Sequence, residues 1–149
     1  MTNKIIVYCD GGARGNPGPA AIGVVIFSNH PQIKSSDYQK EYSKFLGEAT
    51  NNEAEYQAII FALQKIKHLF GNKQAEKLIV EIKSDSELVT NQLNGKNKIK
   101  EKNLQDLFIM IWNLKQDFKK VIFSHIPREE NKIADKLVNQ ELNSQKGLF

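Results

Sequence analysis

The chain has 149 residues, which is enough for one domain with a complete hydrophobic core. A hydrophobic fraction of 40% and a charged fraction of 26% are ordinary for a globular protein, so the composition excludes a disordered chain and a membrane protein. The 21 basic residues exceed the 17 acidic ones, which favours a polyanionic partner, although a solvated lysine-rich surface would give the same balance.

No signal peptide or transmembrane stretch is recognisable, and the single cysteine, Cys9, cannot form an internal disulfide. We therefore expect one domain over residues 1–149, present as a cytoplasmic monomer without a membrane partner. Cys9 falls in the first apolar run, and we expect it to be buried and chemically inert.

The first part of the chain predicts an antiparallel meander. Residues 5–9 are almost continuously apolar, as in a central strand covered on both faces, and residues 21–27 form a second strand. Residues 38–46 are more polar and alternate, which suits an edge strand after a turn at Asn29-His30-Pro31.

The rest of the chain alternates helix and strand. A helical pattern runs from residue 51 to about 70 and stops at Gly71-Asn72. Strands are expected at 78–83 and 121–124, and helices at 86–93, 103–118 and 128–143. This order predicts an α/β fold, a five-stranded mixed sheet of three antiparallel strands and then two parallel ones, flanked by helices.

Four acids occupy distinctive places on this scaffold. Asp10 ends the first strand and Asp85 follows the fourth, so parallel pairing would bring both to one edge of the sheet. Glu55 is in helical register with apolar positions 59, 62 and 66, and Asp135 lies on the apolar side of the last helix, one turn after Asn131. A carboxylate on an inner face needs a partner or a metal ion.

A purely structural reading exists for some of these contexts. Thr50-x-x-Glu53 and Ser84-x-x-Glu87 both match the helix-capping box, so these residues could simply begin helices. Capping does not explain the two helical acids that face inward.

Four motifs, in order, resemble the signature of the type 1 ribonucleases H over nearly the whole chain. They are D-G-G-A-R-G-N-P-G-P-A at 10–20, T-N-N-E-A-E at 50–55, S-D-S at 84–86 and N-K-I-A-D at 131–135. The resemblance implies a ribonuclease H-like fold and an endoribonuclease that hydrolyses the RNA strand of RNA/DNA hybrids, leaving 5′-phosphate and 3′-hydroxyl ends. It implies two Mg²⁺ ions, with Mn²⁺ as a substitute, held by Asp10, Glu55, Asp85 and Asp135.

The resemblance also implies residues that bind the hybrid. Backbone groups of the glycine-rich segment and the side chains of Asn52 and Glu55 would read the 2′-hydroxyl of RNA, which distinguishes it from DNA. Thr50 and Asn51 would contact the DNA strand. The substrate-binding segment comprises Gly11, Gly12, Ala13 and Asn16. The same glycines could instead serve a tight hairpin connection.

Two further features depart from the family pattern. His125 has the spacing of the family's mobile histidine, which assists proton transfer and product release, but the proline after Ile126 stiffens its loop; it is either an accessory catalytic group or a surface residue. The loop at 95–102 is shorter than the basic insertion of some members.

The four lysines of this loop could contact phosphates of the DNA strand or could simply be solvated, and Lys96, Lys98 and Lys100 are the candidates for substrate binding. Trp112 falls among apolar residues of the next helix, and we expect it in the core.

Two other classes of function stay open: a nucleic-acid-binding module of this fold without activity, and a related nuclease or strand-transfer enzyme that acts on DNA or double-stranded RNA. Four intact acids argue against the first, and the short chain argues against strand transfer.

Overall fold

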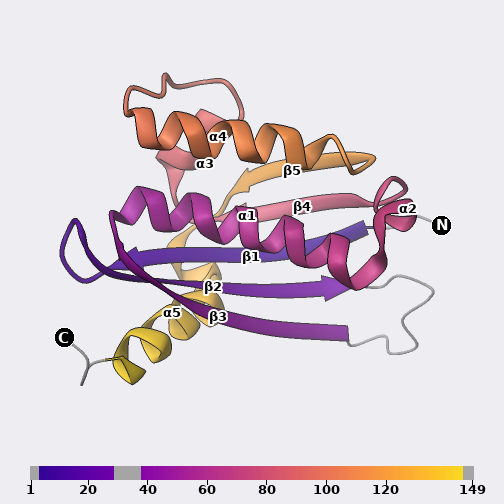
Figure 1. The fold of residues 1–149 in the computed structure, drawn as a ribbon. Coiled ribbons are helices and arrows are strands. Elements are labelled where there is room, and N and C mark those ends of the chain that lie inside the picture. The colour runs from indigo at the N-terminus through magenta and orange to yellow at the C-terminus, as the bar shows by residue number, and fades with distance from the viewer. Residues whose placement is uncertain (1–3, 29–37, 146–149) are drawn as a thin grey trace.

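The structure is a computed structural model that describes residues 4–28 and 38–145. Its five strands form one mixed sheet in the order β3-β2-β1-β4-β5, antiparallel on the β3 side and parallel on the β5 side (Figure 1). The strands are β1 (Lys4–Ala13), β2 (Gly18–Ser28), β3 (Tyr38–Ala49), β4 (Ile79–Ser84) and β5 (Lys120–His125). The predicted α/β class and strand pairing are confirmed.

Helices cover both faces of this sheet. Neighbouring residues of a strand point to opposite faces: a side chain at Gly11 would meet α1, whereas one at Gly12 would meet α5. These two helices therefore lie on opposite sides of β1 (Figure 1). The helices are α1 (Asn51–Phe70), α2 (Asn72–Ala75), α3 (Glu87–Leu93), α4 (Lys102–Lys115), the 3-10 turn η1 (Arg128–Glu130) and α5 (Lys132–Ser144).

The largest difference from the predicted elements concerns the segment after Asp10. β1 continues to Ala13 and pairs with β2, so the residues expected to form a glycine-rich turn are extended strand. The hairpin closes one step later, where the backbone N–H of Arg14 donates to the carbonyl of Pro19 at 2.8 Å. Alternating polarity could not show this extension, because Gly11 and Gly12 have no side chains.

The predicted helix over 51–70 is confirmed to the residue, while the short helix α2 was not expected. The last predicted helix is divided, because η1 ends at Glu130 and α5 begins only at Lys132. The turn expected at 29–31 lies outside the described residues.

The first predicted capping box is confirmed and the second is wrong. Thr50 accepts from the backbone N–H of Glu53, whose carboxylate accepts from the backbone N–H of Thr50. At α3 the cap is Ser86, which accepts from Val89 N–H at 3.2 Å. Ser84 instead accepts from the backbone N–H of Ser86, so its hydroxyl shapes the turn after β4.

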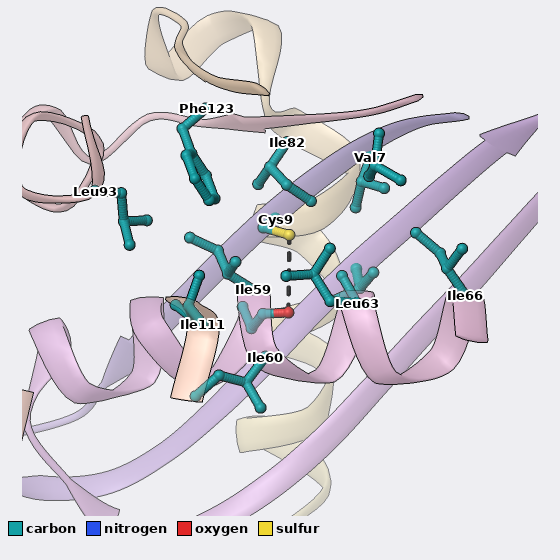
Figure 2. Close-up of a cluster of buried hydrophobic side chains, with 14 of the residues drawn as sticks. Val7, Cys9, Ile59, Ile60, Leu63, Ile66, Ile82, Leu93, Ile111 and Phe123 are labelled. Carbon is teal, nitrogen blue, oxygen red and sulfur yellow. Dashed lines mark hydrogen bonds between the residues drawn. The ribbon is translucent and has the colours of Figure 1, made fainter. Parts of the chain in front are cut away.

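The main core lies between the sheet and the helices on its α1 face (Figure 2). Cys9 is fully buried there, as predicted, with its thiol 3.8 Å from the carbonyl oxygen of Ala58. Burial, with smaller contributions from the charges of Glu55 and Asp10, raises the pKa of this thiol well above its ordinary value, which disfavours the reactive thiolate.

Trp112 is not in the core, contrary to the prediction: its relative exposure is 51%. The inward face of α4 is instead spaced by three and four residues, through Leu104, Leu107, Phe108, Ile111 and Leu114. Trp112 lies off that face, where the ammonium of Lys115 sits 4.3 Å from its ring centroid.

Among the described residues, none of the helices has the length and apolar character required to cross a membrane.

Candidate active site

The four predicted acids converge on one cleft at the carboxyl ends of β1 and β4. Oxygen atoms of Asp10, Glu55 and Asp85 all lie within 4.8 Å of one another. Asp135, in the first turn of α5, lines the same cleft, and its charge contributes to raising the pKa of Asp10. The cleft has a volume of about 360 Å³.

Two glycines let the helices approach closely enough to bring these acids together. A β-carbon on Gly11 would lie 2.3 Å from the carbonyl carbon of Ala54, and one on Gly23 would lie 2.2 Å from the carbonyl oxygen of Ala134. Each alanine directly precedes an acid, Glu55 in one case and Asp135 in the other. Because Gly23 of β2 is also the strand partner of Asp10, both helical acids approach the sheet at the level of Asp10.

Burial and mutual repulsion oppose ionisation in this cluster. Desolvation, followed by the charge of Asp85, raises the pKa of Asp10 to about 7, despite a hydrogen bond with Glu55 that lowers it. The pKa of Glu55 is raised well above its ordinary value by burial and then by Asp10. Burial also raises the pKa of Asp85, although a hydrogen bond from Asn131 and the charge of Arg128 work in the opposite direction.

The donor set fits a divalent cation. Oxygen Oε2 of Glu55 is buried and has no hydrogen-bond partner among the described residues. An unpaired buried carboxylate oxygen is costly unless a cation coordinates it. Carboxylate oxygens are the hard ligands that Mg²⁺ and Mn²⁺ prefer. Asp10, Glu55 and Asp85 form an acidic cluster whose geometry is compatible with metal binding, and Asp135 lines the same cleft.

The glycine-rich segment and the start of α1 are connected by side-chain amides. The backbone N–H of Ala13 donates to Oδ1 of Asn51 at 2.8 Å, and the backbone N–H of Asn51 donates to Oδ1 of Asn16 at 2.9 Å. Gly12, Ala13, Asn51 and Asn52 line the cleft. Asn16 and Thr50 do not line it, and Thr50 is the N-cap of α1.

These contacts revise the expected task of the backbone donors. Hydrogen bonding from the Gly11 N–H lowers the pKa of Glu55, although burial dominates that pKa. The Ala13 N–H is engaged by Asn51. Two of the predicted substrate donors, the N–H groups of Gly11 and Ala13, therefore have partners inside the protein. Gly11 is also required for the close packing of β1 on α1.

His125 and the three loop lysines lie outside the cleft lining. His125 is exposed at the end of β5, and its charge is the smallest of several influences on the pKa of Asp85, which burial dominates. Lys96, Lys98 and Lys100 are exposed in a loop held by two side-chain amides. Those of Gln92 and Gln105 donate to the carbonyls of Lys98 and Ile99.

Sequence reasoning gave no role in the site to Arg14, Arg128 and Asn131. The two arginines line the cleft with the acids. Asn131 is 1% exposed and donates from Nδ2 to the carbonyl of Cys9 at 2.8 Å, so it fixes the start of α5 to the strand that bears Asp10. The sequence did contain a signal for the two arginines, because they are the only arginines among 21 basic residues and one of them, Arg14, lies within the glycine-rich motif.

Comparisons with known proteins agree with this geometry. A family model described as reverse transcriptase-like matches residues 8–141. Ribonuclease HI of Halobacterium salinarum is 36% identical over 140 residues, covering 94% of this chain and 65% of that protein. The bifunctional protein Rv2228c of Mycobacterium tuberculosis is 34% identical over 142 residues, covering 95% of this chain and 36% of its own. The chain thus spans between about a third and two thirds of these relatives.

A solved structure gives the same fold at higher identity. LC11-RNase H1, isolated from compost by a metagenomic approach, was solved in complex with an RNA/DNA hybrid. That structure matches with a TM-score of 0.81 and 46% identity, over 91% of this chain and 94% of the other. Fold, acid cluster and sequence agree, and the chain belongs to the type 1 ribonuclease H family.

Proposed function

We propose that this chain is an endoribonuclease that hydrolyses the RNA strand of RNA/DNA hybrids, leaving 5′-phosphate and 3′-hydroxyl ends. The observation that carries the proposal is the convergence of four acids on one cleft, with a buried carboxylate oxygen of Glu55 that lacks a partner among the described residues. The similarity to LC11-RNase H1, which was solved with such a hybrid, supports this substrate.

The acids would hold two Mg²⁺ ions, or Mn²⁺ in their place, with Asp10 as the shared ligand because it neighbours the other three. Bound ions of this kind lower the pKa of an attacking water and stabilise the departing 3′ oxygen. Glu55 and Asp135 are carried on helices that contact the sheet backbone, so their carboxylates are placed before any substrate arrives.

The hybrid would lie across β1 and the start of α1. Gly12, Ala13, Asn16 and Asn52 would face the RNA strand, where Asn52 and Glu55 read the 2′-hydroxyl. Asn16 keeps its Nδ2 donor for this purpose, because Asn51 engages only its oxygen. Thr50 and Asn51 would contact the DNA strand, and His125 would assist from the end of β5.

The decisive experiment compares cleavage of a hybrid, a duplex RNA and a duplex DNA of one sequence. We expect Mg²⁺-dependent cleavage of the hybrid alone. Asp10→Asn should reduce it by about a hundred- to a thousand-fold or to an undetectable level, because removing one electrostatic group at a reaction centre typically costs about that much. Binding of the hybrid should persist in this variant. Equal cleavage of duplex RNA or DNA would refute the substrate assignment, and an active Asp10→Asn would refute the metal cluster.

A further inference from the structure

Arginine is the rare cation of this chain. Arg14 and Arg128 are the only two arginines among 21 basic residues, and both line the acidic cleft. A guanidinium presents a planar fork of N–H donors that matches two phosphate oxygens, whereas a lysine offers a point charge. The chain therefore places its only forked cations beside the acids.

The two arginines flank the acids from opposite sides. Arg14 belongs to the β1–β2 hairpin, and Arg128 follows β5 in η1. In the sheet order β3-β2-β1-β4-β5, these positions lie on either side of the edge formed by the ends of β1 and β4. If a phosphate of a nucleic-acid strand reaches the acids, that strand also continues past the acids toward the β1–β2 hairpin.

Arg14 is held at both its backbone and its tip. Its backbone N–H donates to the carbonyl of Pro19 at 2.8 Å. Its Nη2 donates to Oδ1 of Asn143, near the end of α5, at 2.7 Å. This bond orients the guanidinium and leaves its other nitrogens available.

Among the described residues, no carboxylate forms an ion pair with Arg14. Over residues 4–28 and 38–145, the ion pairs involve Lys4, Lys67 and Lys102, and neither arginine takes part in one. An exposed cation in a cleft that carries four acids, without a carboxylate partner of its own, is suited to bind an anion.

Three of the neighbouring backbone donors are already engaged. The N–H groups of Gly11 and Ala13 serve Glu55 and Asn51, and that of Arg14 closes the hairpin. A phosphate on this side of the cluster would thus find charged donors on the guanidinium, beside the Nδ2 donor of Asn16. Because the same cleft contains the acids, the strand that lies in it is the strand that is cut.

We propose that Arg14 binds a backbone phosphate of the RNA strand beside the scissile one, on the hairpin side of the acids, and that Asn143 is a positioning residue for its guanidinium. This inference rests on the proposed function and names a contact that fixes the register of the RNA strand. It predicts an effect on KM rather than on kcat, since the acids remain in place.

The test begins with the variants Arg14→Ala, Arg14→Lys and Asn143→Ala. Lys73→Ala is the control for loss of one charge, because Lys73 is exposed on α2, at the other end of the sheet (Figure 1). Arg14→Ala should raise KM for the hybrid about ten-fold, as expected when a charge-assisted hydrogen bond is removed, with kcat within about two-fold. The slope of log KM against log salt should fall by about 0.7–0.9, corresponding to one phosphate.

The conservative variants separate charge from geometry. Arg14→Lys keeps the charge and should retain the salt slope with a KM increase of about three-fold. Asn143→Ala should raise KM in the wild-type background but have no further effect on Arg14→Ala, because it acts only through that side chain.

Neutral phosphates locate the contact. In hybrids with a single methylphosphonate, the KM of the wild-type protein should rise about ten-fold when the neutral group occupies one RNA-strand position next to the cleavage site. The KM of Arg14→Ala should not change at that position. Sensitivity at a DNA-strand position instead, or kinetics of Arg14→Ala equal to those of Lys73→Ala, would overturn this inference alone. No cleavage by the wild-type protein would overturn the proposed function and this inference with it.

Discussion

At the scale of single residues, Asp10 is the group whose surroundings depart most clearly from those of a free carboxylate. Its pKa is raised to about 7 by burial first and then by Asp85, so without metal ions the folded protein keeps its proton to near-neutral pH. The unfolded chain releases it near pH 3.8. The folded state therefore binds more protons between these values, and stability must fall as pH rises through this window.

Asp10→Asn should remove this contribution. In the presence of a chelator, the free energy of unfolding of the variant, relative to the wild type, should increase by roughly 2–4 kcal/mol between about pH 4 and pH 7. Urea denaturation at several pH values measures this difference. Asp106→Asn, which changes an exposed acid of α4 outside the cleft, is the matched control. Parallel profiles for wild type and Asp10→Asn would contradict the assigned environment of Asp10.

Some residue roles could be predicted from the sequence and others could not. The inward direction of Glu55 followed from helical periodicity, and its burial at 8% exposure confirms it. The anchoring of Arg14 could not be predicted, because its partner Asn143 is 129 positions away and only the packing of α5 brings them together. The prediction for Trp112 was wrong for a simpler reason: Leu104 and Ile111 mark the buried face of α4, and Trp112 is rotated by about 100° around the helix from Ile111.

At the scale of elements, the site depends on how closely two helices approach the sheet. Gly11 and Gly12 are adjacent in β1 and adopt negative φ. A substitution at either position therefore tests whether there is room for a side chain, and not whether the backbone conformation is allowed. A β-carbon at Gly11 would collide with the backbone of α1, while one at Gly12 would lie 3.5 Å from a methyl group of Val138. The pair is thus an internal comparison.

Gly11→Ala should destabilise the protein by about 3 kcal/mol, because helix backbone must move to admit the methyl group. It should also reduce kcat, because Glu55 lies at the displaced turn of α1. Gly12→Ala should cost less than about 1 kcal/mol. Thermal unfolding of both variants, with the cleavage assay, measures this, and equal stability losses would refute the close contact between β1 and α1.

The loop between α3 and α4 permits a second comparison at this scale. Its lysines are exposed, while the amides of Gln92 and Gln105 hold its backbone carbonyls, so the charges can be removed without unfolding the loop. Replacing Lys96, Lys98 and Lys100 together by alanine should raise KM for the hybrid and lower its salt dependence, by up to about 0.9 for each phosphate that a lysine no longer neutralises. The kcat and the melting temperature should stay unchanged.

The control for this variant replaces three exposed lysines at the opposite end of the sheet, Lys73, Lys77 and Lys119. It removes the same charge from a surface away from the cleft. If both triple variants lose the same salt dependence, the loop contributes only general electrostatic attraction and is not part of the binding surface.

At the scale of the whole molecule, the strand order was predictable because three meander strands followed by helix–strand alternation leave few topologies. The parallel pairing of β1 with β4 places Cys9 beside Ser84, which is why the next residues, Asp10 and Asp85, meet as expected. The continuation of β1 beyond Asp10 was not predictable, since glycines carry no polarity pattern. The fold thus brings four acids into one cleft, where their mutual repulsion in the ionised state opposes folding.

Divalent cations should therefore stabilise the folded protein. At ten times its dissociation constant, Mg²⁺ should contribute about 1.4 kcal/mol to the free energy of unfolding, a rise of about 3–6 °C in Tm for a chain of this size. Differential scanning calorimetry with NaCl at matched ionic strength separates specific binding from screening. Asp10→Asn should lose most of the rise, because the cluster is reduced to fewer charged ligands. A rise of equal size in wild type and Asp10→Asn would place the stabilising ions elsewhere, and the absence of a rise would refute the cation site.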